Sequence, residues 1–300
     1  SLTWDHDVNK NFSYNLTTYY HRWWAELTQQ QISGAYSYNH EPVECDDFGM
    51  NLKTSTQWGQ GHEIVAGLDY RNYWGSFKWF YGNDFDRVHE YAGFASYRPY
   101  LSFAPDTKLA FSGRYTRTSD DASSFVWDTS VKTPIAGPTY FRGSVGTGFT
   151  LPLLAELSGD FSIGGNTYLG NPDLEPEDSF NIQAGIGGDW KYFNCYAGYF
   201  YNEVDNLIQT VSIGPTTYTY KNVEGKTKIK GAEVSASVGP FYNVSLDAGA
   251  AWTEAEDGDT GEQLEQIPEF NGTINLKYRY GTGRFGADLM AQYTGDIYER

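Results

Sequence analysis

Acidic side chains are the first residues in this sequence whose type and spacing could do chemistry. They gather at Asp46-Asp47, at Asp120-Asp121 and in the run EAEDGDTGE, residues 254–262. Paired carboxylates can serve as the acid and base of a glycosidase, or they can bind calcium. In the run that starts at Asp257, however, Pro268 stands where a calcium loop needs its bidentate Glu. We interpret these acids as solvated loop residues, with divalent-cation bridging near lipopolysaccharide as the alternative.

Other motifs for catalysis or cofactor binding are missing. The sequence has no GxSxG, HExxH or P-loop, and GSVGTGF (143–149) lies in a strand pattern instead of between a strand and a helix. Cys45 and Cys195 are far apart and have no CxxC or zinc spacing. We therefore predict no catalytic residue, no metal site and no cofactor.

The segment GNPDLEPED, residues 170–178, interrupts a long, regular pattern. Pro172 and Pro176 lack a backbone N–H, so neither suits a central strand. Asn171 and Asp173 are turn formers. The segment therefore predicts an end of sheet pairing and a rigid loop. Whether this loop is purely structural or also lines a binding site is open from the residues alone.

The elements that position this loop follow from a period-two pattern. In residues 108–116, Leu109, Phe111 and Tyr115 alternate with Lys108 and Arg114. Similar alternation marks 63–71, 180–186, 274–280 and 285–294. Such strands run roughly 10–14 residues, enough to cross a bilayer when tilted. We expect Leu109, Phe111 and Tyr115 to face lipid, and Lys108 and Arg114 to face a lumen.

Composition narrows the fold class. The 300 residues include 25 Tyr, 9 Trp and 18 Phe, and the formal net charge is −17. A nucleic-acid partner is excluded because phosphate binding needs a basic face. No apolar run is long enough for a transmembrane helix. Aromatic residues near the strand ends favour an outer-membrane β-barrel over a soluble β-sandwich, because Tyr and Trp bracket the lipid-facing band.

The connections are a separate test of this interpretation. We predict short turns at Asp5–Asn11, Gly59–His62, Ala104–Thr107, Thr133–Thr139, Gly187–Lys191, Gly239–Tyr242 and Gly281–Gly283. Between them lie longer connections at 25–47, 75–88, 118–124, 149–178, 203–217, 254–267 and from 295 onward, of which 118–124 is the least distinct. This alternation is typical of barrels with short periplasmic turns, and it divides the chain into about fourteen strands.

Several of these segments carry a family resemblance. FRGSVGTGFTLPLLAELSG (141–159) followed by GNPDLEPEDSFNIQAGI (170–186) is similar to the paired FRAP and NPNL boxes of TonB-dependent outer-membrane receptors. Further segments resemble that family's barrel strands: HEIVAGLDYR (62–71), YNEVDNLIQ (201–209), YKNVEGKTKIKGAEVSASV (220–238) and IPEFNGTINLKYRY (267–280). The resemblance covers essentially the whole chain and is nearest to vitamin B12 and siderophore receptors.

The resemblance implies an all-β fold, a transmembrane antiparallel barrel of which residues 1–300 are one portion. They would form about strands 6–19 of a 22-stranded barrel that is closed by a plug. We expect a plug before Ser1, about three more strands after Arg300 and a natural length roughly twice this one. The outermost segments, Leu2–Trp4 and Arg284–Thr294, would then be unpaired edges of an open curved sheet.

The resemblance also implies a site. It places 170–178 in an extracellular loop, and the residues expected to contact ligand are Phe149, Pro152, Tyr168, Asn171, Asp173 and Leu174. The first box departs from the family, since Phe149-Thr150-Leu151-Pro152 lacks its Arg and Ala. Haem receptors of the family usually carry a His between the boxes, and residues 153–170 have none, which disfavours haem.

The function implied is active transport of a scarce nutrient, such as a ferric siderophore or cobalamin, across the outer membrane of a Gram-negative bacterium. The expected partners are outer-membrane lipid and lipopolysaccharide, the ligand, and TonB acting through the plug. Two alternatives stay open: a passive porin, and a soluble, aromatic-rich carbohydrate-binding β-protein. Plug sequence upstream would separate the first, and solubility without detergent the second.

Overall fold

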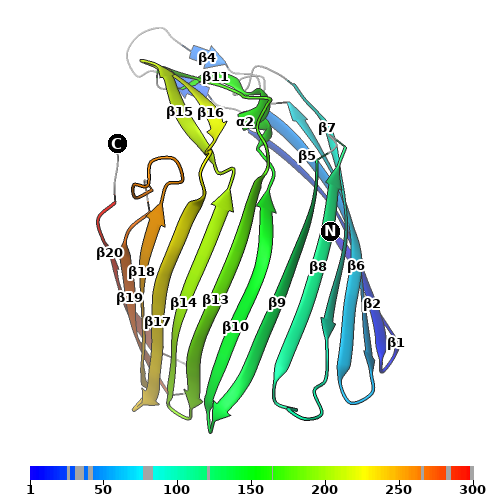
Figure 1. Cartoon of the computed structure of the whole chain (residues 1–300), viewed down its shortest axis with the longest axis vertical. Coiled ribbons are helices and arrows are strands. Elements are labelled where there is room, and N and C mark those ends of the chain that lie inside the picture. Colours follow the sequence, from blue (N-terminus) through cyan, green and yellow to red (C-terminus); the bar gives the residue numbers. More distant parts are fainter. Residues whose placement is uncertain are drawn as a thin grey trace.

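The fold is a single curved sheet, described from a computed structural model. The described residues are 1–25, 28–30, 37–39, 43–76, 84–119, 122–163, 165–264, 267–281 and 285–297. Fourteen antiparallel strands follow one another in chain order around the sheet (Figure 1). They are β1 (Leu2–Asn9), β2 (Phe12–Ala25), β5 (Val43–Trp58), β6 (His62–Ser76), β7 (Asp84–Arg98), β8 (Lys108–Thr118), β9 (Ser123–Ala136), β10 (Thr139–Thr150), β13 (Glu177–Trp190), β14 (Phe193–Asp205), β17 (Thr227–Phe241), β18 (Val244–Glu256), β19 (Phe270–Tyr280) and β20 (Phe285–Thr294).

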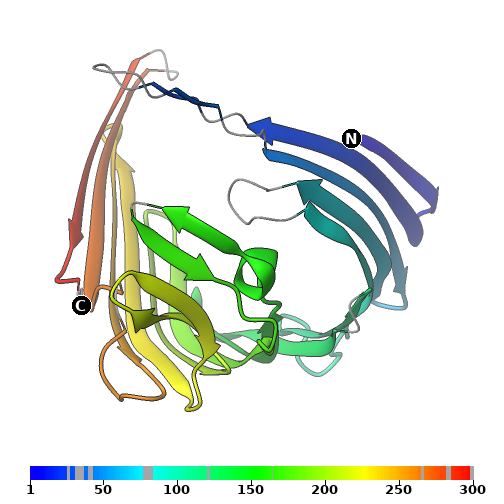
Figure 2. The same ribbon diagram turned by 90° about the horizontal axis from the view of Figure 1, so that it is seen from above.

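The sheet is open. β1 pairs only with β2 and β20 only with β19 among the described strands, so each forms an edge. Seen from above, the sheet bends into a wide arc with β1 and β20 at its two ends (Figure 2). The open curved sheet and its two unpaired edges agree with the prediction; Arg284 itself lies outside the described residues.

The predicted short turns lie where expected, but most are tighter. β1 continues through Asn9, β9 through Ala136, β13 through Trp190 and β17 through Phe241, so the strands consume most of each predicted turn. The β17–β18 turn shows why this is possible. Tyr242 and Asn243 have φ of 49° and 68°, and two left-handed residues in succession close a hairpin whose twist matches the strands.

The long connections also shrink from both sides. β5 begins at Val43 and β7 at Asp84, so the ends of the predicted connections 25–47 and 75–88 belong to strands. The alternation of lengths fails at one place, since connection 99–107 is longer than 119–122 at the opposite end. Thr118 N–H donates to Ala122 O there (2.9 Å), which closes the chain tightly. Parts of the predicted connections and of Gly281–Gly283 lie outside the described residues: 26–27, 31–36, 40–42, 77–83, 120–121, 265–266, 282–283 and 298–300.

Two connections fold into structure of their own. The β10–β13 connection holds helix α2 (Leu154–Ser158), β11 (Asp160–Ile163) and β12 (Asn166–Leu169). The β14–β17 connection holds β15 (Ile208–Gly214) and β16 (Thr217–Asn222). These strands make one small sheet in the order β11-β12-β16-β15. A two-stranded sheet, β3 (Thr28–Gln30) with β4 (Ser37–Asn39), lies in the β2–β5 connection.

Burial is concentrated away from the middle of the wall. Four of the six buried apolar side chains among the described residues belong to the long-connection end of β14 and β18 or to the loops above them: Leu174, Val204, Val223 and Ala255. Thr227, at the start of β17, is fully buried beside this group in sequence. The wall itself is one layer thick, so its apolar side chains have no second layer to pack on. The described chain contains no helix with the length and apolarity needed to cross a bilayer.

Candidate functional site

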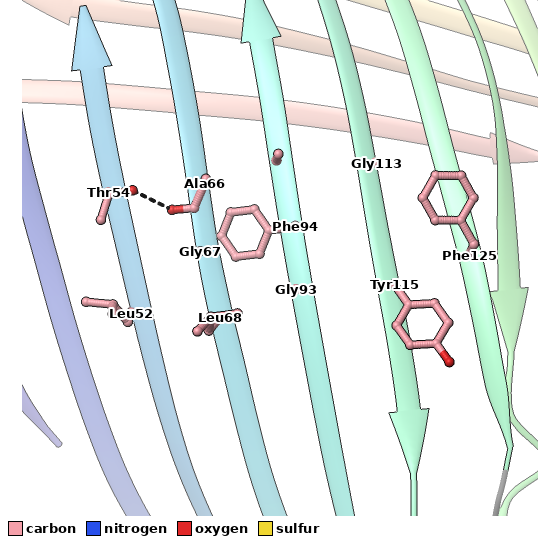
Figure 3. Close-up of a pocket in the computed structure, with 11 residues that line it drawn as sticks. Leu52, Thr54, Ala66, Gly67, Leu68, Gly93, Phe94, Gly113, Tyr115 and Phe125 are labelled. Atoms are coloured by element: carbon pink, nitrogen blue, oxygen red, sulfur yellow. Dashed lines mark hydrogen bonds between the residues drawn. The ribbon is translucent and has the colours of Figure 1, made fainter.

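The outer face of the wall is apolar and carries aromatic residues near both ends. Leu68 is 63% and Phe125 62% exposed, and both project from the convex side with Leu52 and Tyr115 (Figure 3). Trp58, His62 and Tyr97 stack at the short-turn end, with ring centroids 5.5–6.2 Å apart. Tyr70 meets Tyr91 at 5.3 Å on the other half of the strands. Such girdles flank the lipid-facing band of outer-membrane barrels.

The opposite, concave face is polar. Arg114 pairs with Asp69 and lies 3.7 Å from Glu90, and Arg71 pairs with Asp47 at 2.9 Å. The register places these residues on one face of adjacent strands. Phe111 and Tyr115 alternate with Arg114 on β8 and are 44% and 49% exposed. Arg114 and Lys108 therefore face the lumen as predicted, and Phe111 and Tyr115 face outward; Leu109 shares their register face.

The small sheet lies at the long-connection end of the wall, and from above β11 and β12 lie within its arc (Figures 1 and 2). Its central contact is a parallel pairing of β12 with β16, Tyr168 opposite Tyr218. The two strands come from different connections, so this pairing ties the β10–β13 loop to the β14–β17 loop. The position is the mouth of the lumen on the loop side.

The GNPDLEPED segment holds this loop assembly together. The Asn171 side-chain amide donates to Tyr220 O (2.9 Å), and its Oδ1 accepts from the Asp173 N–H (3.0 Å). Asn222 pairs with the Glu175 backbone in both directions, each at 2.9 Å. Pro172 and Pro176 lie outside all strands, as predicted. The break in the strand pattern is therefore an anchor between two loops.

One glycine in the segment is required by a close approach. Gly170 N–H donates to Gly159 O, and a Cβ on Gly170 would stand 2.6 Å from Gly159 N and 2.7 Å from Ser158 N. A larger residue would push β12 away from the end of α2. The tight join explains why a glycine opens this loop segment.

An aromatic row crosses the small sheet. Tyr168 stacks on Phe161 with centroids 5.0 Å apart and planes at 11°, and on Tyr218 at 5.3 Å and 20°. The register puts Phe161, Tyr168 and Tyr218 side by side on one face of β11, β12 and β16. All three rings are half-buried, so each keeps accessible surface. Three aligned rings offer a platform on which a flat or apolar ligand group can stack.

The structure brings only part of the predicted site together. Tyr168, Asn171, Asp173 and Leu174 all belong to the small sheet and the loop anchored to it, with Leu174 buried at 8% exposure. Pro152 lies before α2, in the same connection. Phe149 is on β10 opposite Asp178, on the register face of the outward-pointing Ile182. A ligand-binding role for these residues stays a prediction.

Sequence reasoning missed Phe161 and Tyr218. Both lie in short segments, DFSI and TYTYKN, whose alternation is visible in the sequence. Their partner is set by a pairing between strands separated by about fifty residues, and that register cannot be read from either segment.

The loop carboxylates are held by hydrogen bonds within the loops. Asp257, just beyond β18, accepts from Gln209 Nε2 (2.8 Å), from the Thr260 N–H (2.8 Å) and from the Asp259 N–H (3.0 Å). Partial burial raises the pKa of Asp257, but these hydrogen bonds outweigh it and the pKa is held below its usual value. Within the described part of the chain, no three or more His, Cys, Asp or Glu side chains gather as a metal site.

A one-layer curved sheet with an apolar, aromatic-girdled outside, a polar inside and a structured loop layer at one end is the wall of an outer-membrane β-barrel. The sequence model of the family described as "TonB dependent receptor-like, beta-barrel" matches residues 1–299. The chain belongs to this TonB-dependent receptor family, whose members lie in the outer membrane of Gram-negative bacteria.

Relatives by sequence include a vitamin B12 transporter BtuB of Vibrio vulnificus (strain YJ016). It is 25% identical over 230 residues, which cover 72% of this chain and 36% of that protein. An iron-regulated outer membrane virulence protein of Vibrio cholerae serotype O1 (strain O395) is 27% identical over 218 residues, covering 65% of this chain and 32% of that protein. The chain thus spans about a third of the length of these curated relatives.

Solved structures show the same fold at low sequence identity. A ferric enterobactin receptor of Pseudomonas aeruginosa superposes with a TM-score of 0.77 at 13% identity, covering 98% of this chain and 49% of that one. The copper transporter OprC gives 0.75 at 16% identity, covering 96% and 49%. These likenesses establish the barrel architecture.

Proposed function

We propose that this chain is the barrel wall and outer ligand-binding layer of a TonB-dependent transporter for a scarce, bulky nutrient. The ligand is a ferric siderophore or a cobalamin, captured at the loop end and passed through the lumen. Relatives named for vitamin B12 transport and iron regulation support this substrate class. TonB supplies the energy through a plug, and lipopolysaccharide and lipid surround the outer face.

The observation that carries the proposal is the aromatic row Phe161–Tyr168–Tyr218 above the lumen mouth. Stacking on the row binds flat or apolar parts of a ligand, and the two Tyr hydroxyls add hydrogen bonds. The parallel β12–β16 pairing fixes the row, so the platform exists before the ligand arrives. A preformed platform loses little conformational entropy on binding.

The test compares Tyr168→Ala with Tyr242→Ala in the full natural protein. Tyr242 is 97% exposed on the β17–β18 turn at the opposite end of the wall, so it controls for loss of a tyrosine. Ligands are first chosen by growth rescue of a receptor-deficient strain with a panel of siderophores and cobalamin. Loss of one stacked ring should weaken binding of the rescuing ligand by about 1–2 kcal/mol, or about 5- to 30-fold.

Three results would count against this proposal. Rescue that persists without TonB would indicate a passive channel. Rescue by no siderophore or cobalamin would remove the substrate class. Equal affinity of Tyr168→Ala and Tyr242→Ala for the rescuing ligand would remove the aromatic row as its binding platform.

A further inference from the structure

A row of cations crosses the lumen face near the short-turn end of the wall. Lys108 on β8 is the cross-strand neighbour of Lys132 on β9, and Lys132 is the neighbour of Arg142 on β10. Arg98, near the same end of β7, lines the same hollow of about 470 Å³. We call Arg98, Lys108, Lys132 and Arg142 the basic row.

The basic row is under-compensated by the wall. Arg98 has Glu63 at 2.9 Å, and Arg142 has Glu233 at 3.7 Å. Within the described residues, neither Lys108 nor Lys132 has a carboxylate within ion-pair distance. The chain as a whole is rich in acid, with 38 Asp and Glu against 21 Lys and Arg. The local excess of positive charge therefore does not follow the composition.

The contrast with the rest of the lumen face is direct. Arg114 and Arg71 each face carboxylates on neighbouring strands, and Lys277 binds Asp247 at 2.6 Å. Like charges placed directly opposite on adjacent strands destabilise a sheet. A wall that compensates its other cations and leaves Lys108, Lys132 and Arg142 in one line requires negative charge from outside the wall.

Aromatic rings support two of these cations. The Lys132 Nζ lies 3.8 Å from the centre of the Tyr140 ring, and the Arg142 guanidinium lies 3.8 Å from that of Tyr196. These contacts hold the aliphatic stems against the wall. They leave the charges unneutralised, because a ring contributes only its quadrupole. The row is thus ordered and still charged.

We infer that the basic row binds an acidic protein segment that occupies the lumen at the short-turn end. Adjacent strands are about 4.8 Å apart, so the three aligned cations span about 10 Å. Two or three carboxylates on one face of an extended segment match this span, because alternate residues repeat about every 6.8 Å. A resident segment fits better than a passing anion, since the repulsion within the row must be offset at all times in the folded protein.

Zero-length carbodiimide cross-linking of the full natural protein in its membrane tests the inference. The reagent joins a lysine amine only to a carboxylate that touches it, and mass spectrometry then identifies both residues. We expect Lys108 and Lys132 to be joined to Asp or Glu outside the wall strands. Lys10, on the β1–β2 turn at the same end of the wall, is the exposed control and should give no specific cross-link.

Acylation rates and thermal stability provide two further readouts. With the segment in place, Lys108 and Lys132 should acylate roughly tenfold more slowly than Lys10, because charge-assisted contacts shield their amines. Lys132→Gln should lower the thermal midpoint of the full protein, whereas Lys10→Gln should leave it unchanged. In a wall without a partner, Lys132→Gln would raise the midpoint by relieving repulsion.

Four outcomes would overturn the inference. They are cross-links from the basic row only to wall residues such as Asp128 or Glu233, acylation of Lys108 and Lys132 as fast as of Lys10, protection only after inorganic pyrophosphate is added, or a raised midpoint for Lys132→Gln. The pyrophosphate result would reassign the row to a small anion. None of these readouts involves nutrient uptake, so failure here leaves the proposed transport function to its own test.

Discussion

Replacing Asn171 by Ala should loosen the outer loop layer without unfolding the wall. The substitution removes two hydrogen bonds, from the side-chain amide to Tyr220 O and from the Asp173 N–H to Oδ1. Each neutral hydrogen bond contributes about 0.5–1.5 kcal/mol, so local opening becomes easier by about 1–3 kcal/mol. The population of the opened loop should rise about 5- to 150-fold.

Amide hydrogen exchange is the assay. The Asp173 amide and the amides of β12 and β16 should exchange faster in Asn171→Ala, while those of β13 and β14 keep their rates. Asn181→Ala is the matched control: Asn181 is an exposed asparagine on β13 whose side-chain amide donates only to Ser179 Oγ, at 3.2 Å. It should leave loop exchange unchanged.

The outcome also separates a structural from a binding role for Asn171. If ligand affinity falls by no more than the increase in loop opening predicts, Asn171 acts only by anchoring the platform. If affinity falls much further, Asn171 contacts the ligand. Unchanged exchange at Asp173, β12 and β16 would refute the anchoring argument, because the two hydrogen bonds would then contribute nothing to loop closure.

Three further predictions concern other parts of the chain. Gly67→Ala should weaken β5–β6 pairing by about 1–3 kcal/mol, seen as a smaller folded fraction after refolding into detergent, because a Cβ there would meet Leu52 O at 2.5 Å; Gly93→Ala, whose Cβ would meet only Leu68 Cδ2 at 3.5 Å, should be tolerated. The lowered pKa of Asp257 means that its carboxylate stabilises the loop above the usual Asp range, and this contribution is lost as pH falls through the lowered pKa; loop exchange should accelerate in acid, and Asp257→Asn should abolish that dependence. Deleting residues 153–170 should not remove a haem Soret shift, because they contain no His; a shift that disappears with the deletion would contradict this.

The wall could be predicted because its rule is local. Alternation in 108–116 and 285–294 fixes which side chains face lipid, and the connections order the strands, so about fourteen expected strands became a fourteen-stranded sheet. Strand ends were less predictable. Tyr242 adopts a left-handed φ that composition alone assigns to Gly or Asn, which let β17 continue through Phe241.

The loop layer was harder to predict because its contacts join distant segments. GNPDLEPED was identified as a break, and its prolines do lie outside the strands. Nothing in the sequence showed that Asn171 would bond to Tyr220, or that Tyr168 would lie between Phe161 and Tyr218. Both depend on the parallel register of β12 against β16, and a one-residue slip would turn Tyr168 to the opposite face.

The distribution of burial shows where this fold can change its ligand. The wall is stabilised by its continuous hydrogen-bond ladder and by lipid on its apolar face, and it buries few side chains. The loop layer instead carries its own small group of buried residues, Leu174, Val223 and Ala255, together with the Asn171 and Asn222 anchors. Substitutions on the exposed side of the aromatic row leave both the ladder and this group intact. Ligand specificity can therefore vary at Phe161, Tyr168 and Tyr218 at little cost to the barrel, whereas changes at Asn171 or Gly170 alter the platform for every ligand.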